Sequence, residues 1–306
     1  MGAGAKVGIW APASPARRER VESGISYLKR QGLTPVMPVH PAEFYGRYDH
    51  AFSNGSASAR CQVLYDLLEV HRVDLVLCAR GAFGAIELLP ELDWDRLKKH
   101  SVPLVGYSDV TMLLAACEKH DCLRPIHGPT LSKEFADAET NDSDAKRGIE
   151  ELNCVLGTGL HRRTVPVQAI RPGRGAGAAV AGNLASLCAL IGTPWEVDFA
   201  GRVLFLEEVG EAPYRVYRSL LQLVLSGRFD DLQGLVFGSF SGCTAPHGPT
   251  VEETFDRVTN EFLADKPFPV MKGFPFGHAG LNLPLAFDAQ ASIDGGHVEL
   301  TVNSNR

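Results

Sequence analysis

Three side chains in this sequence have the types that acyl transfer needs. Ser108 follows an apolar run and precedes a helical pattern, Glu207 ends a second apolar run, and His278 lies in a glycine-rich segment. A serine, a histidine and a carboxylate are the parts of a nucleophile, base and orienting set. The combination predicts a hydrolase that works through a covalent acyl intermediate.

The position of Ser108 suits a nucleophile. It lies between the carboxyl end of a predicted strand and the first turn of a helix, where ligands bind in open α/β sheets. Gly106 allows close backbone approach, and the amide of Asp109 and the positive helix end would face a developing oxyanion. A helix N-cap is the simpler alternative for Ser108, and local sequence alone favours it. The segment also lacks the second glycine of the usual hydrolase elbow.

A second unusual turn, Arg-Gly-Ala-Phe-Gly at residues 80–84, follows another predicted strand. Its amides could form the other half of an oxyanion hole, although an ordinary strand-to-helix connection explains the composition equally well. For Glu207 alone, a solvated or helix-capping carboxylate is the better explanation, and most histidines are structural or surface residues. The three residues together favour catalysis more than any one of them does.

The elements that must position these residues alternate along the first half of the chain, which is the pattern of a parallel sheet covered by helices. Strands are expected at residues 7–11, 34–39, 73–79 and 102–106, and helices at 17–31, 57–70, 85–89 and 109–119. In the second half we expect strands at 178–182, 203–207, 234–240, 291–293 and 297–302, and helices at 184–190, 214–226 and 251–262. The fold class is therefore α/β.

The length of 306 residues predicts two domains. Residues 135–144 are acidic and polar, and residues 171–177 are a glycine-rich cluster typical of a loop. We place an N-terminal domain carrying the nucleophile at 1–160, a linker at 161–172, and a C-terminal domain carrying the glutamate and histidine at 173–306.

Composition excludes several classes of protein. The net charge of −6, with both signs mixed, offers no basic stripe for nucleic acid. The first apolar stretch is too short for a signal peptide, and no later window has the length of a membrane span. Seven scattered cysteines predict free thiols in a reducing compartment, and their spacing lacks a zinc signature. A cytoplasmic protein is expected.

The chain resembles the LD-carboxypeptidases and the related microcin C immunity peptidases, because eight short sequence blocks occur along it in the order seen in those proteins. The resemblance covers nearly the whole chain, and ordered blocks are more specific than any one of them. The blocks lie at residues 80–84, 106–109, 127–129, 182–184, 192–195, 206–208 with 214–218, 238–242 and 276–278.

The resemblance implies a flavodoxin-like parallel-sheet N-terminal domain, a smaller C-terminal α/β domain and a homodimer. It places the nucleophile on Ser108, the base on His278 and the carboxylate on Glu207, with Glu208 as a spectator. The oxyanion amides fall on Asp109, Gly81 and Ala82. Ala82 replaces the glycine usual in the family, and alanine resists a positive φ that glycine accepts. Arg80, Asn183 and Trp195 are candidates for substrate binding.

The reaction that the resemblance implies is hydrolysis of an amide between an L-centre and a terminal D-residue, as in release of D-alanine from murein tetrapeptide during cell-wall recycling. No metal or organic cofactor is needed. One alternative is an immunity peptidase that cleaves peptide-nucleotide antibiotics of the microcin C type. A second is a non-catalytic protein that binds a small peptide, which the three triad positions argue against.

Overall fold

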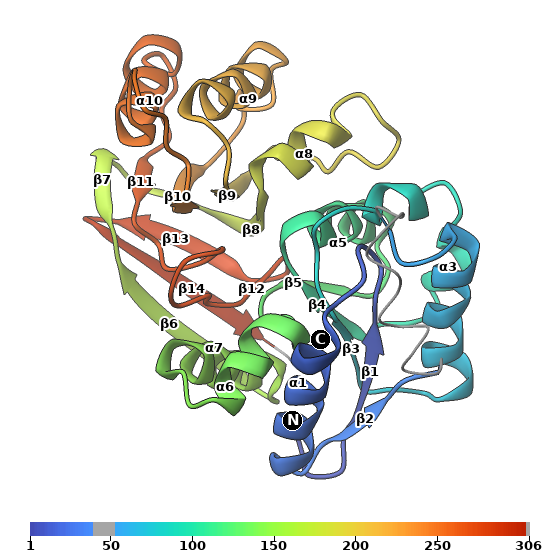
Figure 1. Cartoon of the computed structure of the whole chain (residues 1–306). Coiled ribbons are helices and arrows are strands. Elements are labelled where there is room, and N and C mark those ends of the chain that lie inside the picture. The colour runs from blue at the N-terminus through green and yellow to red at the C-terminus, as the bar shows by residue number, and fades with distance from the viewer. Residues whose placement is uncertain (39–52, 304–306) are drawn as a thin grey trace. The chain divides into compact units, whose positions relative to one another are not determined.

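The computed structural model describes residues 1–38 and 53–303, and the chain divides into two compact units, Met1–Gly157 and Thr158–Arg306 (Figure 1). Both are mixtures of helices and strands, which confirms the α/β class. In the described parts of the chain, no helix is long and apolar enough to cross a membrane.

The first unit is built on a parallel sheet. In its described residues the strand order is β2-β1-β3-β4-β5, which is the flavodoxin-like order. Ligands bind at the carboxyl ends of such strands, so the loops after β3 and β4 are the ones that matter for the site. The strands are β1 (Lys6–Trp10), β2 (Thr34–Val36), β3 (Leu75–Cys78), β4 (Pro103–Gly106) and β5 (Arg124–His127).

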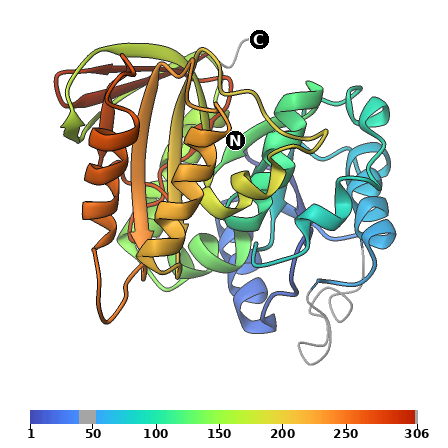
Figure 2. The same ribbon diagram turned by 90° about the horizontal axis from the view of Figure 1, so that it is seen from above.

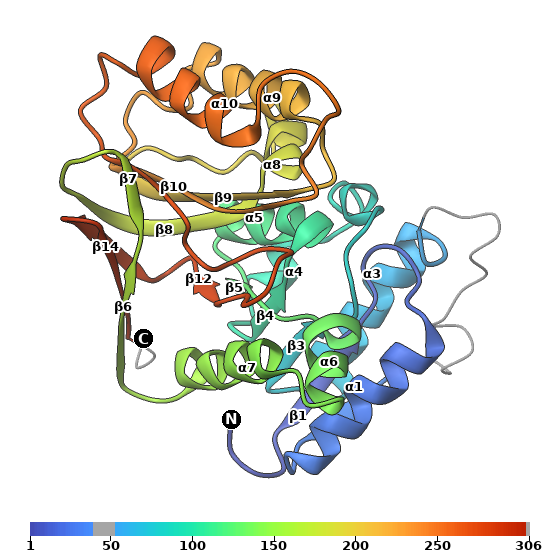
Figure 3. The same ribbon diagram turned by 60° about the vertical axis from the view of Figure 1, so that its left-hand side comes forward.

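Helices cover both faces of this sheet. Helices α1, α6 and α7 gather on one face, and α3 and α5 lie on the other (Figure 3). The helices are α1 (Arg18–Arg30), α3 (Ala57–Tyr65), α4 (Trp94–Leu97), α5 (Thr111–His120), α6 (Ala136–Glu139) and α7 (Ser143–Leu156). Short 3₁₀ turns span Ala85–Leu88 and Ser108–Val110, and π-helical turns span Asp66–Val70 and Leu131–Phe135.

Most of the elements expected in this unit are confirmed within a few residues. The strand expected at 34–39 is seen as β2, and residue 39 lies outside the described residues. The acidic and polar stretch 135–144 is partly helical: α6 lies within it, and the Asp142 side chain caps α7 by accepting from the Ala145 amide at 2.8 Å. Acidic residues are favoured at helix starts, so a polar stretch there does not exclude helix.

The second unit contains a mixed sheet in the order β6-β14-β13-β8-β9-β10-β11-β7. Strands β8 to β11 are parallel, and the outer strands are antiparallel to their neighbours. The strands are β6 (Leu160–Pro166), β7 (Gln168–Arg171), β8 (Gly175–Asn183), β9 (Arg202–Val209), β10 (Gly234–Ser241), β11 (Val270–Lys272), β13 (Gln290–Asp294) and β14 (His297–Asn303), with β12 (Leu285–Ala286) as a further short strand.

Three helices pack on one face of this sheet (Figure 2). They are α8 (Leu184–Leu190), α9 (Pro213–Leu225) and α10 (Val251–Arg257), the last continued by a π-helical turn at Val258–Phe262. The helices and strands expected in this half are all present. Because β8 to β11 run parallel, the ends of β9 and β10 lie at one edge, and this edge carries Glu207.

One expectation for the second half is wrong, and a second holds only for residues 172–174. Residues 161–172, expected as a linker, lie in β6 and β7 except for residues 167 and 172, and β6 pairs with β14 along its whole length. Val165 is the only buried residue of β6, and most of its other side chains are polar, which lowers the hydrophobicity of the segment and hides its strand character. The glycine-rich cluster at 171–177 contains the start of β8, where a Cβ at Gly175 or Gly177 would collide with a neighbouring backbone oxygen. Glycine here permits close strand approach.

Candidate active site

The nucleophile candidate has a strained backbone. Ser108 directly follows Tyr107 at the end of β4 and begins the 3₁₀ turn that leads into α5. Its φ is +65°, a value that non-glycine residues rarely adopt and that costs about 1–3 kcal/mol. Ser108 therefore lies at a sharp strand-to-helix turn that presents its hydroxyl, and the N-cap alternative does not explain this conformation, since an N-cap has extended backbone angles.

The turn after β3 contacts Ser108 directly. A Cβ added to Gly81 would lie 2.8 Å from the Ser108 Cβ and 3.1 Å from both the Ser108 Oγ and the Asp109 amide nitrogen. No side chain fits at this position, so glycine is required by sterics. The contact brings together the two backbone segments that were expected to supply the oxyanion amides.

Ala82, the next residue, has a φ of +85°. The expected conflict between alanine and this position is therefore present in the fold, at a cost of about 1–2 kcal/mol relative to an unstrained alanine. Despite this strain, Ala82 still supplies a backbone amide that can donate a hydrogen bond. Gly84 closes the same turn with a φ of +125°.

Replacing Ala82 by glycine is expected to stabilise the protein by about 0.5–1 kcal/mol. Relief of the positive φ outweighs the larger conformational entropy that glycine has in the unfolded chain. Urea unfolding measures the change, with Ala85→Gly as the matched control. Ala85 lies in a helical turn without this strain, so its replacement should lower stability. Equal losses in both variants would contradict the assignment of strain to residue 82.

The carboxylate of Asp109 ties α5 to the turn at residues 80–84. It is 5% exposed, and its Oδ2 accepts a hydrogen bond from the Ala85 amide at 2.7 Å. Burial raises the pKa of Asp109 from its usual 3.8 to about 6, only partly offset by that amide and by the nearby Arg60 charge. The backbone amide of Asp109 thus lies beside Ser108, whereas its carboxyl fixes the turn at residues 80–84.

A pH-dependent difference in stability follows for Asp109→Asn. Between pH 4 and 6 the folded wild type binds more protons than the unfolded chain, so wild-type stability falls as pH rises through this window, by about 2–3 kcal/mol at most. Asparagine can still accept from the Ala85 amide and does not titrate. The unfolding free energy of the variant minus that of wild type, from urea titrations, should therefore increase from pH 4 to 6 and then level off. A constant difference from pH 4 to 7 would show that Asp109 is not shifted.

Arg60 also holds the turn at residues 80–84 in place. Its guanidinium is 3% exposed, donates to the carbonyl oxygens of Pro12 and Gly84 and pairs with Glu87. The bond to the Gly84 oxygen is 2.9 Å long. No pattern in the sequence pointed to Arg60 as part of the site. A buried arginine has no periodic signature, because its partners are backbone carbonyls from distant segments.

In the second unit, Glu207 and His278 form a close pair. The His278 Nδ1 lies 2.6 Å from the Glu207 Oε2, and Glu207 is completely buried at the end of β9. A buried carboxylate on one ring nitrogen fixes the tautomer and orientation of the imidazole. The structure thus brings together the predicted base and the predicted orienting group.

The backbone next to His278 has no room for a side chain. Gly277 has a φ of +105°, and a Cβ there would lie 2.7 Å from the Glu207 Oε2 and 2.6 Å from the Ser239 Oγ. Its amide donates to the Asn282 Oδ1 at 3.0 Å. These constraints explain why a glycine precedes the histidine.

Aromatic packing holds the loop that carries His278. Phe274 and Phe276 are buried and pack edge-on against Phe205 of β9, with ring centroids 5.2 and 6.1 Å apart. A Cβ on Gly238 would overlap the Phe276 ring. Two side chains of the loop are therefore anchored on the strand that also carries Glu207.

Glu208 has a structural role. Its Oε1 accepts from the Asn183 side chain at 2.7 Å and the Val209 amide at 2.8 Å, and its Oε2 accepts from the Ala185 amide at 2.9 Å. Burial raises the pKa of Glu208 despite these donors. The Asn183 Oδ1 in turn caps α8 by accepting from the Ser186 amide at 3.1 Å. Asn183, predicted to bind substrate, is thus engaged in a local network.

The other two candidates for substrate binding are placed as follows. Arg80 is half-buried, and its Nη1 donates to the Pro15 carbonyl oxygen at 3.1 Å. Trp195 is half-buried in the loop after α8, next to Glu196, which accepts from the Gly192 amide at 2.7 Å. In the described residues, no group of three or more His, Cys, Asp or Glu side chains is arranged to hold a metal ion.

Two family models match this chain. The model of the LD-carboxypeptidase N-terminal domain matches residues 7–128, and that of the LD-carboxypeptidase C-terminal domain matches residues 176–293. The murein tetrapeptide carboxypeptidase of Pseudomonas aeruginosa is 30% identical over 297 residues, covering 95% of this chain and 93% of that protein.

Solved structures share the fold at lower identity. A muramoyltetrapeptide carboxypeptidase from Oxalobacter formigenes has a TM-score of 0.84 at 24% identity, covering 97% of this chain and 98% of that one. The microcin C7 self-immunity protein MccF, in complex with glutamyl sulfamoyl guanosine, has a TM-score of 0.86 at 22% identity, covering 99% and 98% of the two chains. The MccF sequence of Escherichia coli is 23% identical over 321 residues, covering 95% of this chain and 90% of that protein.

Proposed function

Because the chain belongs to the LD-carboxypeptidase family, we propose that it is a serine carboxypeptidase that releases terminal D-alanine from murein tetrapeptide. Ser108 is the nucleophile, His278 the general base and Glu207 the carboxylate that orients it. The observation that carries the proposal is the 2.6 Å contact between the His278 Nδ1 and the buried Glu207. Such a pair is costly to bury and is a frequent feature of catalytic sites.

The mechanism follows from these roles. With its Nδ1 hydrogen-bonded to Glu207, the imidazole uses its Nε2 to take the proton from the Ser108 hydroxyl as the oxygen attacks the scissile carbonyl. The new C–O bond gives a tetrahedral oxyanion. The amides of Asp109 and of the Gly81–Ala82 turn stabilise it, because hydrogen-bond donors fixed in advance need no reorganisation.

Collapse of the tetrahedral intermediate breaks the C–N bond. His278 gives its proton to the leaving amine, D-alanine departs, and an acyl-enzyme remains on Ser108. Water, deprotonated by His278, then attacks the ester and restores the serine. Glu207 stabilises the imidazolium in both halves of the cycle.

Substrate recognition, location and assembly are further parts of the proposal. A carboxypeptidase must bind a free terminal carboxylate. A guanidinium can bind a carboxylate through two hydrogen bonds at once, and Arg80 is the proposed residue for this contact. Asn183 and Trp195 complete the proposed pocket. All seven cysteines are free thiols, which supports a reducing, cytoplasmic location for this recycling step. By its family resemblance the protein is proposed to be a homodimer, which equilibrium sedimentation can test.

The testing experiment is release of free D-alanine from purified murein tetrapeptide by the wild-type protein in buffer with a chelator and no added cofactor. Release supports the proposed reaction and its independence from added metal. Absence of release both with and without chelator would overturn the murein assignment.

The likeness to MccF favours a second candidate, cleavage of a peptide-nucleotide antibiotic of the microcin C type. The same serine, histidine and glutamate would attack the acyl group of that substrate. Parallel assays with a murein tetrapeptide and an aminoacyl sulfamoyl nucleoside, compared by kcat/KM, distinguish the two. A higher kcat/KM for the nucleoside substrate would reverse the assignment.

A further inference from the structure

A buried turn in the first unit contacts the segment that leads into Ser108. Glu134, 6% exposed, lies in the π-helical turn Leu131–Phe135 and accepts from the Thr130 amide at 2.8 Å and the Thr130 hydroxyl at 3.3 Å. The Tyr107 hydroxyl is a further hydrogen-bond partner of the same carboxyl. Tyr107 is itself 5% exposed and directly precedes Ser108, so the Glu134 side chain holds the residue on which the nucleophile turn begins.

The same turn also contacts the other catalytic segment. The Ser132 amide donates to the Ala79 carbonyl oxygen at 3.0 Å, and Ala79 directly precedes the turn at residues 80–84. One short stretch of chain therefore hydrogen-bonds to the residue before each of the two loops that meet at Ser108 and Gly81.

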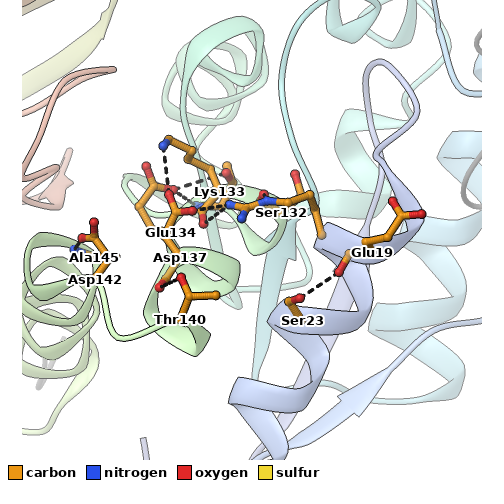
Figure 4. Close-up of polar contacts among 11 residues, drawn as sticks. Glu19, Ser23, Ser132, Lys133, Glu134, Asp137, Thr140, Asp142 and Ala145 are labelled. Carbon is orange, nitrogen blue, oxygen red and sulfur yellow. Dashed lines mark hydrogen bonds and ion pairs between the residues drawn. The ribbon is translucent and has the colours of Figure 1, made fainter.

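Helix α1 anchors this turn from the opposite side. Arg20 donates to the Ser132 and Lys133 carbonyl oxygens at 2.9 and 3.0 Å and pairs with Asp137. Lys133 reaches the same aspartate at 2.9 Å, and Figure 4 shows Ser132, Lys133, Glu134 and Asp137 gathered in this cluster. These contacts tie the turn to α1 and limit its movement.

Close packing also holds the turn Leu131–Phe135 against α1. A Cβ on Gly24 of α1 would lie only 2.4 Å from the Leu131 carbonyl oxygen, so the helix and the turn are in close backbone contact. The Tyr27 ring packs edge-on against Phe135 at 6.1 Å. The turn is thus held by hydrogen bonds, an ion pair and apolar contacts.

We propose that residues 130–135 form a brace that fixes the nucleophile turn relative to the oxyanion turn, with Glu134 and Tyr107 as positioning residues. The inference rests on the proposed function, because it takes Ser108 as the nucleophile. Neither residue is placed to touch the reacting atoms, and both act through the backbone of Ser108.

The physical reason is the strain at Ser108. A positive φ at a serine persists only where the surrounding structure over-determines it. The hydroxyl of Tyr107 is a hydrogen-bond partner of Glu134, whose turn is held by Arg20 of α1. The Tyr107 ring also packs on the buried His127 ring, with centroids 5.6 Å apart. Burial raises the pKa of Glu134, so its carboxyl is costly to bury unless its hydrogen bonds offset the cost.

The test compares Tyr107→Phe, which removes only the hydroxyl, with Tyr27→Phe, which makes the same change on the other side of the brace. With murein tetrapeptide, Tyr107→Phe is expected to lower kcat about 10-fold or more, while KM stays within about twofold, because misplaced reacting groups mainly slow the chemical step. Tyr27→Phe should retain wild-type kcat. Labelling of Ser108 by a serine-directed acylating probe should slow in Tyr107→Phe by a similar factor.

A second pair of variants examines the carboxyl itself. Glu134→Gln keeps a side chain that can accept from Thr130 and bond to Tyr107, and should retain most of the activity and labelling rate. Glu134→Leu should lose both to the extent seen in Tyr107→Phe, and its melting temperature should also fall, because the buried Thr130 amide loses its acceptor.

Wild-type kcat and labelling rate in Tyr107→Phe would overturn the brace. So would equal losses in Tyr107→Phe and Tyr27→Phe, which would indicate a general effect on stability. Failure of the proposed function is seen separately, as absence of D-alanine release by the wild type. The labelling rate of Ser108 tests the brace even then.

Discussion

Ser108→Ala is expected to abolish release of D-alanine from murein tetrapeptide, lowering kcat by at least about 10³-fold. Removal of the hydroxyl leaves no atom to form the acyl-enzyme, and the remaining oxyanion donors and binding contacts give only a residual rate. The backbone is expected to persist, because alanine and serine pay a similar cost for the φ of +65°. Free D-alanine is measured with wild type and variant at equal concentration.

Ser101→Ala is the matched control, since Ser101 is an exposed serine just before β4, at the opposite end of that strand from Ser108. It should retain wild-type kcat, and the melting temperatures of the three proteins should lie within a few degrees. If Ser108→Ala keeps its activity, Ser108 is not the nucleophile. If neither wild type nor variant releases D-alanine but both bind the tetrapeptide, the protein is a binding protein.

Glu207→Gln is expected to lower kcat by about 10³–10⁴-fold. The glutamine amide can still bond to the His278 Nδ1, but an uncharged partner no longer stabilises the imidazolium, and donation from the amide would favour the wrong tautomer for a base at Nε2. The contact is 2.6 Å long and Glu207 is completely buried, so water does not readily take the place of the lost charge. KM should change far less than kcat, since Glu207 acts mainly on the transition state.

Glu208→Gln separates this effect from a general loss of structure. Glu208 is the adjacent residue, is 3% exposed and accepts from three donors, so its replacement leaves a buried donor unsatisfied and should cost about 1–3 kcal/mol of stability. Folded Glu208→Gln protein should nevertheless keep kcat within about 10-fold of wild type. A larger loss of kcat in Glu208→Gln than in Glu207→Gln would exchange the roles of the two carboxylates.

These predictions depend on features with different origins in the sequence. Apolar runs and helical spacing predicted the parallel strands β1, β3 and β4 and the helices α1 and α5. Each of these elements can be read from the spacing of apolar residues within its own segment. The places of Ser108, Glu207 and His278 at strand ends or in a glycine-rich loop were visible for the same reason. Strand β6 was missed because Val165 is its only buried residue, so the segment shows no apolar alternation.

The sequence by itself therefore determined the α/β class, the ordered motifs of the family and the residue types available for catalysis. The tertiary structure decided which of them meet. Glu207 and His278 lie 71 positions apart, yet their side chains are 2.6 Å from each other. Gly81 contacts Ser108, and Glu134 hydrogen-bonds to Tyr107, through segments that no local pattern connects. Side-chain periodicity records only which face of an element is buried, whereas contacts between distant segments depend on how all the elements pack together.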